Sequence, residues 1–164
     1  MRVKSIITAV TTVAIALMMY TVPASAATAP RQNFLVIFSG TADNPRATVV
    51  ASGAFSSQGS ATEESFQDNS DGSLTTVERF DFAAGSVTVT AVGYATEHLN
   101  AQACLDTNSA RGTFIFSGTG NLAGIAGHGT FDERGFFLAT RTPPGCAPPL
   151  TLHAIVRYAG IIDR

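Results

Sequence analysis

The side chains in this 164-residue chain that could do chemistry are few and lie far apart. Its three histidines, His98, His128 and His153, stand on separate segments, whereas zinc ligands usually come in pairs at close spacing. No Gly-x-Ser-x-Gly elbow accompanies the many serines. Glu97 and His98 are adjacent, so on a strand their side chains would point to opposite faces. We therefore predict no metal site and no cofactor, and the sequence identifies no catalytic residue.

Four polar side chains are better candidates because they stand within or beside strand-like segments: Glu78, Tyr94, His153 and Arg157. A charge that is buried without a partner is costly. If Glu78 or Arg157 faced the inside of a closed sheet, it would need a partner or would line a wet cavity. We predict these four residues as ligand-lining candidates, with ordinary surface and rim positions as the alternative.

The elements that must position these residues are β-strands, since no segment after residue 26 keeps a helical period over ten residues. Turn clusters such as Asn69-Ser70-Asp71-Gly72 separate the apolar or alternating segments. The predicted strands are 33–38, 47–55, 62–67, 74–82, 86–96, 112–117, 127–132, 136–141 and 150–161. Short connections favour a single antiparallel up-and-down β-barrel of about eight strands. A β-sandwich is the alternative fold.

Two strands alternate clearly. In 86–96, Val87, Val89 and Ala91 share one face with Gly93 and Ala95, and Tyr94 lies on the other. In 150–161, Leu152, Ala154, Val156 and Tyr158 share one face, while His153, Ile155 and Arg157 share the opposite one. The pattern alone leaves open which face is the interior.

The first 26 residues have the pattern of an export signal. Arg2 and Lys4 precede an apolar stretch, and Ala24-Ser25-Ala26 supplies the small residues of a cleavage site. The apolar stretch is shorter than the roughly 20 residues that a membrane-spanning helix needs. We predict cleavage after Ala26, a flexible lead-in over 27–32, and one barrel domain over 33–164. The protein is then secreted, with no membrane attachment after cleavage.

Composition excludes one class of partner. Lys4 is the only lysine, so the chain after residue 26 has none, and its arginines are outnumbered by 12 acidic residues. Such a chain lacks the basic field that a nucleic-acid-binding protein requires.

The only two cysteines, Cys104 and Cys146, lie in the part predicted to be exported, where disulfides form and persist. We predict that they pair and close a loop of about 40 residues, for which the chain-entropy model gives about 4 kcal/mol of stabilisation. The bond would tie the loop after Leu99 to the proline-rich segment 143–149, and both segments are predicted to be loops.

One glycine-rich stretch is similar to a hairpin found in a known group of proteins. Ser117-Gly118-Thr119-Gly120 and Gly127-His128-Gly129-Thr130-Phe131 resemble the penultimate hairpin of the allene oxide cyclase/dirigent-type (calycin-like) barrels. The preceding strand, Phe82 to Thr90, and the loop with Cys104 are similar to those of small secreted bacterial proteins of this group. The resemblance covers roughly residues 80–140. It implies a barrel fold and allows a trimer, but it transfers no catalytic residue.

Three functional hypotheses follow. The first is a secreted barrel that binds a small, mostly apolar ligand or serves as an extracellular scaffold, because an eight-stranded barrel can hold one small ligand. The second is a cofactor-independent cyclase or isomerase that shapes its substrate by confinement. The third is a protein-interaction or inhibitor module acting through the proline-rich segment. The sequence leaves the oligomeric state open.

Overall fold

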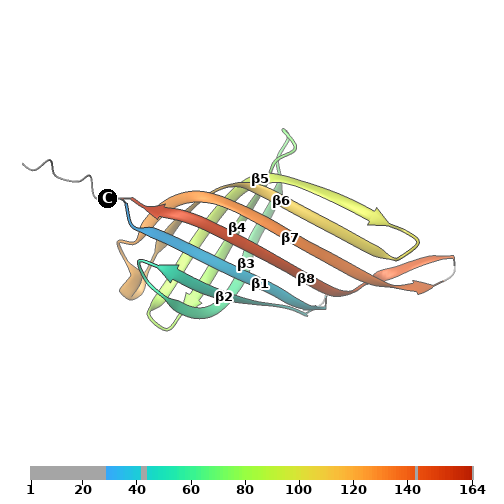
Figure 1. Cartoon of the computed structure of the whole chain (residues 1–164), viewed down its shortest axis with the longest axis horizontal. Helices are drawn as coiled ribbons and strands as arrows, with labels where there is room; N and C mark the ends of the chain where they lie inside the picture. Colours follow the sequence, from blue (N-terminus) through green and yellow to red (C-terminus); the bar gives the residue numbers. More distant parts are fainter. Residues whose placement is uncertain (1–28, 42–43, 143, 164) are drawn as a thin grey trace, which may run out of the picture.

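The computed structural model describes residues 29–41, 44–142 and 144–163, within which eight strands form a closed barrel (Figure 1). The strands are β1 (Arg31–Thr41), β2 (Asn44–Gly53), β3 (Ser57–Asp68), β4 (Leu74–Phe82), β5 (Gly85–Asn100), β6 (Leu105–Gly118), β7 (Ala126–Thr142) and β8 (Gly145–Ile162). Each strand pairs antiparallel with its neighbours in the chain, and β8 pairs with β1 to close the ring. The predicted up-and-down barrel is confirmed. The alternative β-sandwich is wrong, because the β1–β8 ladder joins all the strands into one sheet.

The more apolar face of each alternating strand forms the interior. In β5, Val87, Val89 and Ala91 are buried. In β8, Val156 and Tyr158 are buried on the face opposite to Arg157. Burying these side chains removes apolar surface from water, and this is the main driving force that selects the inward face.

One end of the barrel is filled by aromatic rings. Phe34 packs against Phe80 and Phe116 with ring centroids 5.4 and 5.5 Å apart. Leu122, on the short 3₁₀ turn η1 (Gly120–Leu122), belongs to the same core cluster. Positive φ angles at Gly120 and Gly124 (63° and 88°) allow the chain to turn here between β6 and β7, a conformation that a residue with a Cβ adopts at a cost.

Several strands are longer than predicted. β7 is continuous over 126–142, where two strands separated by Glu133-Arg134-Gly135 were expected. Gly135 pairs with Asn108 of β6 and with Ala154 of β8. The neighbouring strands on both sides therefore provide hydrogen-bond partners for the backbone of this turn-like tripeptide. β1 also begins earlier than predicted, because Arg31 and Gln32 of the predicted lead-in are its first residues.

The predicted disulfide is confirmed, with Cys104 and Cys146 bonded across a sequence separation of 42 residues. Cys104 lies in the turn between β5 and β6, and Cys146 lies near the start of β8. The prediction that the proline-rich segment is a loop is wrong, because β8 begins at Gly145 and pairs with the end of β7. The bond therefore joins two long hairpins, which extend past β1 and β2 in Figure 1. The predicted export signal and its cleavage site lie outside the described residues.

Candidate functional site

The interior is hollow on the side of the aromatic core that faces the disulfide-linked hairpins. The cavity has a volume of about 290 Å³. In β4, for example, Glu78 lines it, whereas Phe80, one inward position further on, belongs to the core cluster. Ala91 of β5 and Tyr158 of β8 belong to both. The barrel is thus divided into a packed half and a half with room for a ligand.

Glu78 is the most buried acid of this cavity. Its side chain projects inward from β4 and the residue is only 5% exposed. Within the described part of the chain, its Oε2 atom has no hydrogen-bond partner. Burial raises the pKa of Glu78 to about 7, and the nearby charges of Glu133 and Glu63 act in the same direction, whereas a hydrogen bond from the Tyr158 hydroxyl opposes them. Near neutral pH this carboxyl group can therefore exist in either protonation state.

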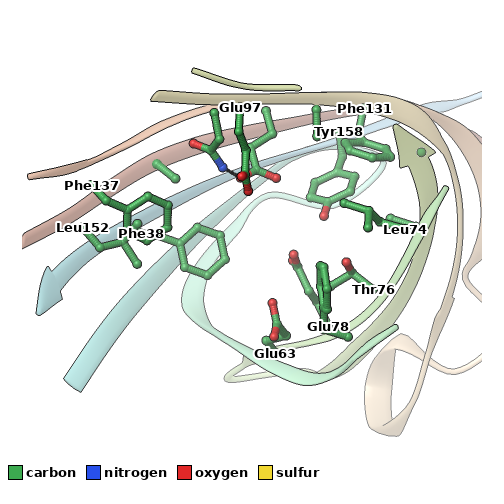
Figure 2. Close-up of a pocket in the computed structure, with 17 residues that line it drawn as sticks. Phe38, Glu63, Leu74, Thr76, Glu78, Glu97, Phe131, Phe137, Leu152 and Tyr158 are labelled. Atoms are coloured by element: carbon green, nitrogen blue, oxygen red, sulfur yellow. Dashed lines mark hydrogen bonds between the residues drawn. The ribbon is translucent and has the colours of Figure 1, made fainter. Parts of the chain in front are cut away.

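Tyr158 stands beside Glu78 and is held by other rings. The residue is 3% exposed, and its ring lies 5.0 Å from that of Phe114 and 5.8 Å from that of Phe131, centroid to centroid. Figure 2 shows its hydroxyl pointing into the cavity, toward the wall that carries Glu78 and Glu63. Burial, followed by the charge of Glu78, raises the pKa of the Tyr158 phenol. The phenol therefore stays protonated and acts as a hydrogen-bond donor.

Glu63 enters the site through the register of β3 and β4. It pairs directly with Glu78, so two carboxyl groups project inward from neighbouring strands. Like charges at paired positions repel each other. Burial raises the pKa of Glu63. A β-bulge between Glu63 and Ser65 shifts the in–out alternation of β3, so that Phe66 also lines the cavity.

A second acidic group faces the first from the opposite wall. Asn108 of β6 donates a hydrogen bond from Nδ2 to Glu133 Oε1 of β7, over 3.1 Å. Burial raises the pKa of Glu133, and the Asn108 bond opposes that effect. Asn108 Oδ1 is buried and has no partner. Glu97 of β5, which pairs with Asn108, completes the acidic lining.

The rest of the lining is mainly apolar. Phe38, Phe137 and Leu152 form one side of the cavity in Figure 2, and Phe131 and Leu74 lie near Tyr158. Gly93 makes room for Phe131, because a Cβ atom there would approach the Phe131 ring to 2.8 Å. Phe66, Glu63 and Glu97 are exposed as well as cavity-lining, so the cavity is open to solvent at this side.

Of the four residues predicted to line a site, the structure places only Glu78 in this cavity. Tyr94 is 61% exposed on the outer face of β5. The Arg157 side chain is on the outer face of β8, where Nη1 lies 3.5 Å from Asp132 Oδ2. His153 is also on that outer face and lines a separate surface hollow with Ile37 and Phe136.

Sequence reasoning missed Tyr158, Glu133 and Glu63 as site residues. For Tyr158 the signal was present, because it shares the apolar face of Ala154 and Val156. Glu133 is in phase with Phe131 and Phe137 once 126–142 is taken as one strand. Glu63 stood in a short, polar segment, and nothing in its neighbourhood predicted the bulge that follows it.

Within the described part of the chain, no group of three or more His, Cys, Asp or Glu residues is arranged to hold a metal ion. No helix in that part is long and apolar enough to cross a membrane. Comparisons with family models, with curated proteins and with solved structures found no match for this chain.

Proposed function

We propose that this protein binds a small, mostly apolar ligand inside its barrel. The observation that carries the proposal is the division of the interior into a ring-filled half and a cavity of about 290 Å³, near the lower end of the usual size of ligand pockets. The cavity is lined by phenylalanines together with a few inward polar groups, the combination that gives a ligand both affinity and orientation. Export through the signal over residues 1–26 belongs to the same proposal and would place the binding site outside the cell.

The experiment fills the cavity and measures binding. Ala110 of β6 lines the cavity, and its neighbour Ser109 is exposed on the outer face of the same strand. Ala110→Phe should abolish binding of the neutral probe 2-phenylethanol, whereas Ser109→Phe should leave it unchanged, as measured by calorimetry. Native mass spectrometry of protein from culture medium would add the mass of a co-purifying ligand and show whether residues 1–26 are absent. If Ala110→Phe binds the probe as wild type does, the cavity is not the binding site.

A cofactor-independent isomerase or cyclase is the second candidate, and the Glu78–Tyr158 pair favours it. A carboxyl group with a pKa of about 7 can accept and return a proton near neutral pH, and the hydrogen bond from the Tyr158 hydroxyl orients this carboxyl group. The probe reaction is exchange of the acidic carbon-bound protons of cyclohex-2-enone in D₂O. Catalysed exchange should be lost in Glu78→Gln and kept in Glu64→Gln, because Glu64 is on the outer surface and paired with Arg79. Exchange no faster than in buffer would rule against this candidate and leave the binding proposal standing.

A further inference from the structure

The ionisable side chains that carry charge in the cavity lining are all acidic. Four glutamates line the cavity, namely Glu63, Glu78, Glu97 and Glu133. Among the described residues that line it, none is Arg, Lys or His. Arg79 and Arg157 point outward into surface ion pairs with Glu64, Asp81 and Asp132. In a low-dielectric recess, groups of one sign reinforce each other and attract the opposite charge. A carboxylate ligand such as a fatty acid would be repelled from this cavity.

The unpartnered buried polar atoms of the lining point to the same ligand chemistry. Glu78 and Asn108 line the cavity, and each has one buried oxygen atom, Oε2 and Oδ1, without a hydrogen-bond partner among the described residues. The orientation of Asn108 follows from the bond that its Nδ2 donates to Glu133, so Oδ1 is the atom left over. A buried acceptor without a donor costs stability. A ligand that supplies an N–H or O–H donor would therefore complement this lining.

Aromatic rings supply the remaining recognition. Phe38, Phe66, Phe131 and Phe137 line the cavity together with Tyr158. The face of an aromatic ring attracts a cation and also packs well against an apolar body. In Figure 2 the carboxyl groups stand on both walls between Tyr158 and the cluster of Phe38, Phe137 and Leu152. A ligand with a cationic end and an apolar end matches this distribution.

We propose that the ligand is a small protonated amine with an apolar body, held by an ammonium hydrogen bond to the carboxylate of Glu78. This inference rests on the proposed function, because it assigns the chemical class of the ligand in the same cavity. A quaternary ammonium ion has the charge but no N–H donor, so it leaves Glu78 Oε2 without a hydrogen bond. A neutral alcohol has a donor but gains nothing from the four glutamates.

The test compares three probes of similar size and shape by calorimetry at pH 7.5: 2-phenylethylamine, 2-phenylethanol and 3-phenylpropionate. We expect the amine to bind at least about tenfold more tightly than the alcohol, since one charge-assisted hydrogen bond commonly contributes that much. We expect the acid to bind most weakly. In Glu78→Gln the amine should lose about tenfold in affinity while the alcohol is unchanged, and the matched surface variant Glu64→Gln should bind all three as wild type does.

The preference should also depend on pH. Glu78 is faced by Glu63 from β3, Glu97 from β5, Glu133 from β7 and Tyr158 from β8, so its ionisation adds to a negative cluster. Between pH 5.5 and pH 8 the carboxyl group of Glu78 ionises while an alkylamine stays protonated. The amine-to-alcohol affinity ratio should rise over this range in wild type and rise less in Glu78→Gln.

The outcomes separate the two proposals. If the alcohol or the acid binds as tightly as the amine, or if Glu78→Gln binds the amine as wild type does, the amine assignment is overturned and the binding function stands. If none of the three probes binds, both proposals fail.

Discussion

The burial of the ionisable side chain of Glu78 lowers the stability of the barrel. The residue is 5% exposed, one of its carboxyl oxygens has no partner among the described residues, and the acids Glu63 and Glu133 lie near it. An uncharged side chain of the same shape would avoid the unfavourable ionisation of a buried acid. A residue that works against folding while facing a cavity is typical of a binding or catalytic position.

This cost predicts how stability changes with pH. The pKa of Glu78 rises from an ordinary value of 4.5 to about 7 on folding, so between these pH values the unfolded chain loses the proton that the folded chain keeps. The contribution of Glu78 is therefore most favourable below pH 4.5, falls as pH rises to 7, and is constant above. The full loss is about 3 kcal/mol at 1.36 kcal/mol for each pH unit.

Glu78→Gln should accordingly be more stable than wild type at pH 8, by up to about 3 kcal/mol, and equal to it at pH 4. Urea unfolding at the two pH values measures this difference. Glu64→Gln is the control, because that side chain forms an exposed ion pair with Arg79 and should change stability by less than about 1 kcal/mol. A variant that is less stable than wild type at pH 8 would show that Glu78 is not penalised by burial.

At the scale of elements, two long hairpins are linked at their ends. The β5–β6 and β7–β8 hairpins carry the disulfide between Cys104 and Cys146. The Ala139 amide also donates to the Cys104 carbonyl oxygen over 2.9 Å, so a backbone contact supports the covalent one. Phe137 and Leu152, on β7 and β8 near this end, line the cavity. The link therefore holds together the part of the barrel that borders the site.

Replacing both cysteines by serine should lower the free energy of unfolding by about 2–4 kcal/mol, because the unfolded chain regains the freedom of a loop of about 40 residues. Amide hydrogen exchange should become faster at the ends of these hairpins and change little in the Phe34–Phe80–Phe116 core, which the bond does not touch. Uniform loss of protection across the barrel would show instead that the hairpin ends unfold only with the whole barrel.

On the scale of the whole molecule, the closing ladder brings together the start of β1 and the end of β8. Arg31 at the start of β1 pairs with Ile161 near the end of β8, and the Ile162 amide donates to the Pro30 carbonyl oxygen over 2.9 Å. The ends lie beside the aromatic core, away from the hairpins that border the cavity (Figure 1). The barrel can therefore be cut elsewhere without loss of any strand pair.

A circular permutant that joins residues 30 and 163 by a short Gly/Ser linker, with new ends between Ser70 and Asp71, should fold and bind 2-phenylethanol as the original chain does. The Asn69–Gly72 turn lies outside the ladder, so this cut breaks no strand. New ends between Asn108 and Ser109 interrupt β6 and should prevent folding. Circular dichroism and size-exclusion chromatography distinguish the two results. An unfolded Ser70/Asp71 permutant would contradict the closed, next-neighbour topology.

Much of this architecture was predictable because its signals are local. Alternation in 86–96 and 150–161 assigned the residues of β5 and β8 to faces, since successive side chains on a strand point to opposite sides. Short turns predicted the next-neighbour strand order, and an even number of cysteines predicted the bond between Cys104 and Cys146. Among the site residues, Glu78 was found by the same local reasoning, as a charge in the middle of a strand.

The rest of the site depends on contacts between residues far apart in the chain. Glu63 faces Glu78 only because the register of β3 on β4 sets them opposite each other, and the bulge then turns Phe66 inward. Glu133 and Asn108 meet across β6 and β7, and they face Glu78 only after the β1–β8 ladder closes the ring. Closure also turned Tyr94, His153 and Arg157 outward, because the more apolar face of each strand gains more by burial. The patterns of single strands thus predict the fold. The acidic cavity depends on the register between strands and on closure of the barrel, which no single segment encodes.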